Sequence, residues 1–71
     1  MNRDTLLDEL ARVEREAVEG ERQLAEQEAR LVALTQQNLE TGKVRAALDL
    51  MREHQRRRDQ DRQRLLSLLQ R

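Results

Sequence analysis

The first half of the chain repeats its apolar side chains every seven residues. The inward positions of this repeat, a and d, are occupied in turn by Leu6, Leu10, Val13, Ala17, Gly20, Leu24, Gln27, Leu31 and Leu34. Alternate steps of three and four residues keep these positions on one helix face. The pattern therefore predicts a long amphipathic helix over residues 4–37 that packs one face against a neighbouring helix.

A second apolar row, named here the outer stripe, runs beside that face on the same predicted helix. Its members are Leu7, Ala11, Val18, Ala25, Val32 and Leu39. The row lies about 100° around the helix from the a positions. One neighbouring helix covers one row, so two rows require two neighbours. We expect the outer stripe to bind a second copy of the chain or the helix of a partner protein.

Helical sequence is interrupted once, near the middle of the chain. Asn38 tolerates the left-handed conformation that ends helices, and Leu39 can then contact the last helical turn. Thr41 is a suitable N-cap for a second helix, while Asp4 or Thr5 is expected to cap the first. The predicted elements of this single domain (1–71) are helix 4–37, connection 38–41 and helix 42–70. Gly20 lies inside the first helix at a cost of about 1 kcal/mol relative to Ala, which close packing would explain.

The second predicted helix is apolar at both ends and polar between them. Residues 52–64 contain no apolar side chain. When the chain folds back at the connection, residues whose numbers sum to about 79 meet, so Val13 faces Leu65 and the polar middle faces Gly20. Apolar segments then match at both ends, which predicts an antiparallel hairpin.

The charges are consistent with the same register. Residues 4–40 hold ten acidic and four basic side chains, and residues 41–71 hold four acidic and nine basic ones. The expected pairs across the helices are Glu14 with Arg64, Glu21 with Arg57 or Arg58, and Glu28 with Arg52. Each exposed pair contributes only about 0–1 kcal/mol, so these pairs specify the antiparallel arrangement more than they stabilise it.

Composition narrows the fold class and the location. The 71 residues include no Cys, no Pro, no aromatic residue and one His. Without Cys there are no disulfides, thiolate metal sites or Cys nucleophiles. A chain this short has a small core and needs a further source of buried surface. We therefore expect an all-α fold in which an antiparallel two-helix hairpin dimerises into a four-helix bundle. No apolar stretch of a membrane span or signal peptide is evident, which predicts a cytoplasmic protein with no membrane partner.

Several short segments follow one another in a recognisable order: Glu19-Gly20-Glu21-Arg22, Gln27, the Asn38–Thr41 connection, Arg45-Ala46 and Asp61-Arg62-Gln63-Arg64-Leu65. In this order they resemble a family of short bacterial helical-hairpin, coiled-coil proteins of unknown function, over most of the chain. The sequence departs from the family at Asn38, where the family has Gly, and at Arg58, where the family has His. The resemblance implies the hairpin fold and implies no activity.

Candidate catalytic or metal-binding groups are few. His54 is the only imidazole, and Met51 stands three residues before it, so the Glu-x-x-His ligand pair of di-iron helical bundles is absent. The chain also lacks a Gly-rich phosphate loop. We expect a protein that is not an enzyme and that holds no metal or cofactor.

A basic run in the second half provides an alternative function. The candidate nucleic-acid contacts are Arg56, Arg57, Arg58, Arg62 and Arg64. Arginines in a row on a helix can bind phosphates. However, Asp59 and Asp61 interrupt the run, and no aromatic side chain is present to stack on a base. The sequence thus favours a non-catalytic interaction or assembly module acting through helix faces, with a nucleic-acid-binding regulator as the alternative.

Overall fold

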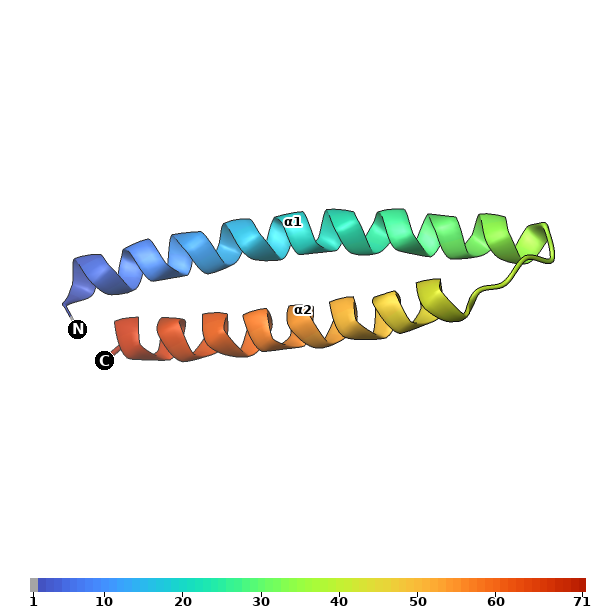
Figure 1. Ribbon diagram of the computed structural model, residues 1–71. Coiled ribbons are helices and arrows are strands. Elements are labelled where there is room, and N and C mark those ends of the chain that lie inside the picture. The colour runs from blue at the N-terminus through green and yellow to red at the C-terminus, as the bar shows by residue number, and fades with distance from the viewer. Residues whose placement is uncertain (1) are drawn as a thin grey trace.

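Two antiparallel helices dominate the computed structural model, which describes residues 2–71 (Figure 1). Helix α1 spans Arg3–Gln36 and helix α2 spans Gly42–Leu69. The helices lie side by side with both termini at one end, in a body of 53 × 14 × 14 Å. The predicted all-helical hairpin is confirmed. Met1, which the predicted domain includes, lies outside the described residues.

Helix α1 begins at Arg3 because Asn2 caps it. The Thr5 backbone N–H donates to Asn2 Oδ1 at 2.8 Å, which satisfies one of the N–H groups that a helix start leaves free. The prediction that Asp4 or Thr5 is the cap was wrong, since both already lie inside the first turn. At that place the Asp4 carboxylate lies near the positive end of the helix dipole.

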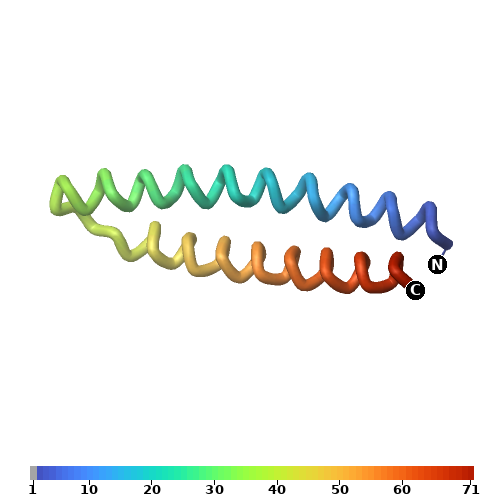
Figure 2. The backbone as a smooth tube through the Cα atoms, turned by 180° about the vertical axis from the view of Figure 1, so that it is seen from behind, coloured from blue at the N-terminus to red at the C-terminus, as the bar shows by residue number. Residues whose placement is uncertain are grey.

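Helix α1 ends in a Schellman motif. Asn38 adopts the left-handed conformation that the sequence predicts, with φ of 57°. Its N–H donates to the Thr35 carbonyl at 3.1 Å, and the Leu39 N–H donates to the Leu34 carbonyl at 3.0 Å. These two bonds occupy carbonyls that the last turn leaves free. Beyond this turn the chain doubles back into α2 (Figure 2).

Helix α2 follows Thr41, but the Thr41 hydroxyl makes no capping hydrogen bond. Instead, the Gly42 N–H donates to Glu40 Oε1 at 2.9 Å. Thr41 Oγ1 accepts from Arg45 Nε at 3.1 Å. The acidic side chain of Glu40 therefore performs the capping that the sequence assigns to Thr41, and its charge suits the positive end of the helix.

The helices pack through the a and d residues of α1, and we name this contact the seam. At the end that holds the termini, the apolar cluster consists of Leu6, Val13 and Leu65, with Leu10, Leu68 and Leu69 half-buried against them. At the connection end, the buried side chains are Val44 and Leu48. Apolar side chains therefore gather at both ends of the hairpin, as the predicted register requires.

Ion pairs across the seam are fewer than predicted. Arg52 approaches Glu28 to 3.9 Å, as expected. Arg64, however, lies 3.9 Å from Asp61 of its own helix, which replaces the predicted pair with Glu14. Residues three or four apart on one helix are neighbours whatever the tertiary structure. An acidic residue at this spacing can therefore bind an arginine in place of an acidic residue on the other helix.

Charged side chains are frequent along both helices and make up 39% of the whole chain. Within residues 2–71, neither helix contains an apolar run of the length needed to cross a membrane.

Replacement of Asn38 tests the turn. Asn38→Ala places an alanine in the left-handed region, which Asn tolerates but which costs alanine about 1 kcal/mol. Asn38→Gly relieves that cost and leaves stability equal to or slightly above that of wild type. Urea unfolding of the three proteins at one concentration, followed by far-UV circular dichroism, measures both effects. Equal stability of the Ala and Gly variants would contradict the turn described above.

Candidate interaction surface

The outer stripe lies on a face of the hairpin that α2 leaves open. Its larger side chains have exposed fractions of 43% (Leu7), 70% (Val18), 56% (Val32) and 53% (Leu39). Ala11 and Ala25 are exposed as well. The first five members stand on α1, and Leu39 follows in the connection. The structure therefore brings the predicted stripe together, and α2 buries none of it.

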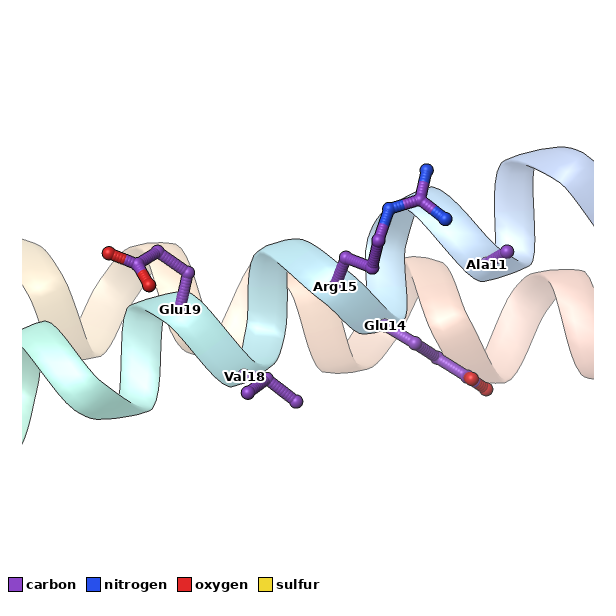
Figure 3. Close-up of a pocket in the computed structure, with 5 residues that line it drawn as sticks. All are labelled: Ala11, Glu14, Arg15, Val18 and Glu19. Carbon is purple, nitrogen blue, oxygen red and sulfur yellow. The ribbon is translucent and has the colours of Figure 1, made fainter.

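A shallow depression marks the outer stripe in the first half of α1. It is lined by Ala11, Glu14, Arg15, Val18 and Glu19 (Figure 3). Ala11 and Val18 are the members of the stripe, and the Glu14 and Arg15 side chains extend to opposite sides of the helix. The depression is thus a short apolar strip with Glu14 on one side and with Arg15 and Glu19 on the other.

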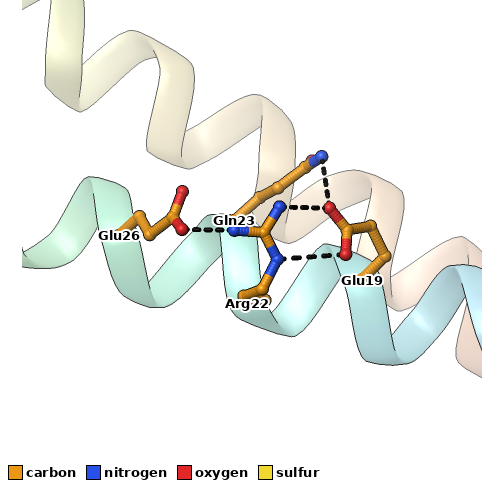
Figure 4. A network of polar contacts seen from close by, with 4 residues as sticks. All are labelled: Glu19, Arg22, Gln23 and Glu26. Atoms are coloured by element: carbon orange, nitrogen blue, oxygen red, sulfur yellow. Dashed lines mark hydrogen bonds and ion pairs between the residues drawn. The ribbon is translucent and has the colours of Figure 1, made fainter.

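One guanidinium near the stripe holds two carboxylates (Figure 4). Arg22 Nε donates to Glu19 Oε2 at 3.0 Å, and its terminal nitrogens donate to Glu19 and Glu26. Gln23 Nε2 donates to Glu19 as well, at 3.3 Å. These four residues are exposed, so the contacts order the surface of α1 more than they stabilise it.

The same network shifts two pKa values. The hydrogen bond from Arg22 lowers the pKa of the Glu19 carboxyl below its ordinary value. The hydrogen bond to Glu19 raises the pKa of Arg22. Because the native state favours ionised Glu19, the contribution of this group to stability is present at neutral pH and is lost as the pH falls through its lowered pKa.

The middle of the seam is a polar layer, formed by Ala17, Gly20, Gln55 and Arg58. Gln55 Nε2 donates to the Ala17 carbonyl at 2.9 Å, and Arg58 Nη1 donates to Gln55 Oε1 at 2.8 Å. Gly20 is buried beneath these side chains. A β-carbon at Gly20 would stand 2.8 Å from Gln55 Cδ, which is too close for two carbon atoms. The close packing predicted at Gly20 is therefore confirmed.

Two of the five candidate arginines lie in the seam. Arg58 is half-buried in the polar layer, and Arg62 is half-buried one turn further along α2. Arg62 Nε is out of contact with solvent and has no hydrogen-bond partner among the residues from 2 to 71. Neither guanidinium is presented freely to a phosphate backbone.

The other three candidate arginines are exposed. Arg56 and Arg57 both pair with Glu53, and the Arg57 Nε lies 3.4 Å from its carboxylate. The pair with Glu53 replaces the predicted pair of Arg57 with Glu21. Arg64 pairs with Asp61, as described above. The structure thus divides the predicted basic run between the seam and the outer surface of α2.

Hydrophobicity does not identify the seam positions in the middle of α2, because residues 52–64 include no apolar side chain. The signal that identifies them is spacing alone. Steps of four and three lead from Val44 through the half-buried or buried positions Leu48, Met51, Gln55, Arg58 and Arg62 to Leu65. A polar stretch between two apolar segments can therefore continue a heptad seam without interruption.

The remaining candidate chemistry is sparse in the described part of the chain. The His54 side chain is exposed. No three His, Asp or Glu side chains within residues 2–71 gather around a point that could hold a metal ion.

Comparison with known proteins identifies no relative. No family model, no curated protein and no solved structure matches the chain. The resemblance to bacterial helical-hairpin proteins stays a prediction, and the surface chemistry described above is the basis for a functional proposal.

A double-mutant cycle tests the polar layer. Gly20→Ala improves helix propensity by about 1 kcal/mol, but in wild type it displaces Gln55 from the Ala17 carbonyl, which loses about 1 kcal/mol. We expect a near-zero net change in wild type and a gain of about 1 kcal/mol in the Gln55→Ala background, where Arg58 has lost its contact with Gln55 and its flexible end can move away from the new β-carbon. Urea unfolding measures all four proteins. The matched control is the Gln63→Ala background, because Gln63 is exposed on α2. We expect Gly20→Ala to change stability there by the same amount as in wild type. If Gly20→Ala raised the free energy of unfolding equally in wild type and in the Gln55→Ala background, Gln55 would not occupy the space over Gly20.

Proposed function

We propose that the chain is a small, non-catalytic cytoplasmic module that assembles with other helices through the outer stripe. One observation carries this proposal: an apolar row is exposed along α1 and into the connection, from Leu7 to Leu39. Extended apolar patches exposed on small proteins mark interaction sites, because their burial removes apolar surface from water.

The small interior of the hairpin is a second reason for association. The buried apolar side chains within residues 2–71 are Leu6, Val13, Val44, Leu48 and Leu65. The polar layer divides them between two ends. Chains of this length seldom reach ordinary stability on such a core without a further source of burial. Each Å² of apolar surface that a partner covers contributes about 25 cal/mol.

The occupant we favour is a second copy of the chain. Two hairpins joined through their outer stripes bring four helices together and provide the second neighbour that each α1 lacks. The other possible occupant is a helix of a different protein, which would lie in the same apolar row. Membership in the bacterial hairpin family is compatible with either role.

Sedimentation of a stripe variant tests this proposal. Val18 is exposed by 70% in the single chain, so Val18→Glu leaves the hairpin intact but puts a charge in the interface. We expect wild type to sediment as a dimer at micromolar concentration and Val18→Glu as a helical monomer.

The matched control is Leu50→Glu, because Leu50 is exposed by 58% and stands on α2 outside the stripe. We expect this variant to sediment as wild type does. A wild-type protein that is a stable, folded monomer at micromolar concentration contradicts self-association, and equal dissociation of both variants contradicts the assignment of the interface to the outer stripe.

The second candidate function, nucleic-acid binding by α2, rests on the exposure of Arg56, Arg57 and Arg64. Each of these guanidiniums already lies beside a carboxylate, and Arg58 and Arg62 are half-buried. The remaining positive surface is therefore small for a protein that neutralises several phosphates.

Titration of labelled RNA and DNA separates the two functions. We compare wild type with the triple variant Arg56→Ala/Arg57→Ala/Arg64→Ala at two salt concentrations. We expect wild type and the triple variant to bind equally weakly. Tight wild-type binding that weakens with salt and disappears in the triple variant would favour the second function instead.

A further inference from the structure

The outer stripe has two edges of opposite charge. The residues three positions after Ala11, Val18 and Ala25 are Glu14, Glu21 and Glu28. The residues four positions after the same three are Arg15, Arg22 and Ala29. On a helix, positions i+3 and i+4 lie on either side of the line through residue i. We name these sets the acidic edge and the basic edge.

The hairpin places the acidic edge toward α2. Glu28 of this edge approaches Arg52 of α2 to 3.9 Å. The basic edge lies across the stripe from it, and Figure 3 shows Glu14 and Arg15 on opposite sides of α1. Any helix that covers the outer stripe therefore lies beside glutamates on one side and beside Arg15 and Arg22 on the other, where Arg22 also holds Glu19 and Glu26 of its own helix.

The relative direction of the two α1 helices determines which of their edges face each other. If two copies join their outer stripes antiparallel, edges of the same kind face each other, and the glutamates lie opposite glutamates. If the two α1 helices are parallel, the acidic edge of each copy faces the basic edge of the other, as e and g positions do in parallel coiled coils. Like charges placed opposite each other disfavour the first arrangement.

We propose that a second copy binds the outer stripe with its α1 helix parallel to and in register with the first, about a two-fold axis along the helices. This inference rests on the proposed function and adds the orientation of the two copies. Glu14 then faces the partner's Arg15. Glu21 faces the partner's Arg22, and within each chain this guanidinium also holds Glu19 and Glu26. The two α1 helices form the centre of the assembly, and each α2 remains on its own seam.

Glu14 and Arg15 are available for these contacts. Both are exposed, and neither has an ion-pair partner among the described residues 2–71. The stripe residues beside them, Ala11 and Val18, are small, so two helices can approach closely at this point. The depression of Figure 3 lies in this segment.

In a parallel, in-register dimer every stripe residue lies opposite its own copy. An antiparallel dimer on the same stripe instead brings Ala11 of one chain opposite Val32 of the other. A disulfide requires β-carbons about 3.5–4.5 Å apart, so cross-linking distinguishes these arrangements. The chain contains no Cys, and single Cys substitutions therefore report one position at a time.

We would prepare the full chain as Ala11→Cys and as Val32→Cys and equilibrate each in a glutathione buffer. Arg12→Cys is the matched control at the same height on α1 but off the stripe, and Leu50→Cys is the control on α2. Non-reducing gels measure the disulfide-linked fraction. We expect both stripe variants to cross-link with themselves about tenfold more than either control, because the dimer raises their effective concentration.

Two results would overturn the parallel arrangement and leave the proposed function intact. One is preferential formation of the mixed disulfide when Ala11→Cys and Val32→Cys chains are combined. The other is cross-linking at control level in a chain that still sediments as a dimer. Control-level cross-linking together with monomeric sedimentation would overturn both the orientation and the self-association on which it rests.

Discussion

The heptad contact between α1 and α2 is the constraint on which the rest of the molecule depends. It is apolar at both ends and polar in the middle, and Gly20 provides the space for Gln55 and Arg58. A slip of one heptad would press these polar side chains against residues that carry β-carbons and would leave the space at Gly20 empty. The polar layer therefore sets the register, in the way that single polar residues do in coiled coils.

The surface follows from that register. Because α2 occupies the a and d face of α1, the outer stripe is left exposed, with Val18 at 70% and Val32 at 56%. The same register directs Glu28 toward Arg52 of α2 and so defines the side on which the acidic edge lies. The features that favour a second helix on this face, apolar surface and oppositely charged edges, are thus consequences of how the hairpin is built.

The basic residues of α2 show how tertiary contact changes the meaning of a charge pattern. Five arginines within nine residues suggest a phosphate-binding surface. Heptad spacing places Arg58 and Arg62 in the seam, where their long side chains cover the weak centre of the hairpin. The three that remain outside lie beside Glu53 or Asp61. A role in packing and in local ion pairs therefore accounts for most of the run.

The sequence by itself determined the two helices, the left-handed turn at Asn38, the antiparallel register and the membership of the outer stripe, because these follow from periodicity and from local backbone preferences. Only the tertiary structure decided that Gln55, Arg58 and Arg62 pack at seam positions, because residues 52–64 carry no apolar side chain to mark that face. The caps by Asn2 and Glu40 and the pairs of Arg57 and Arg64 within α2 are local contacts that the sequence permits, but it offers each group several equivalent partners and does not select among them. Helix periodicity limits that competition but does not resolve it.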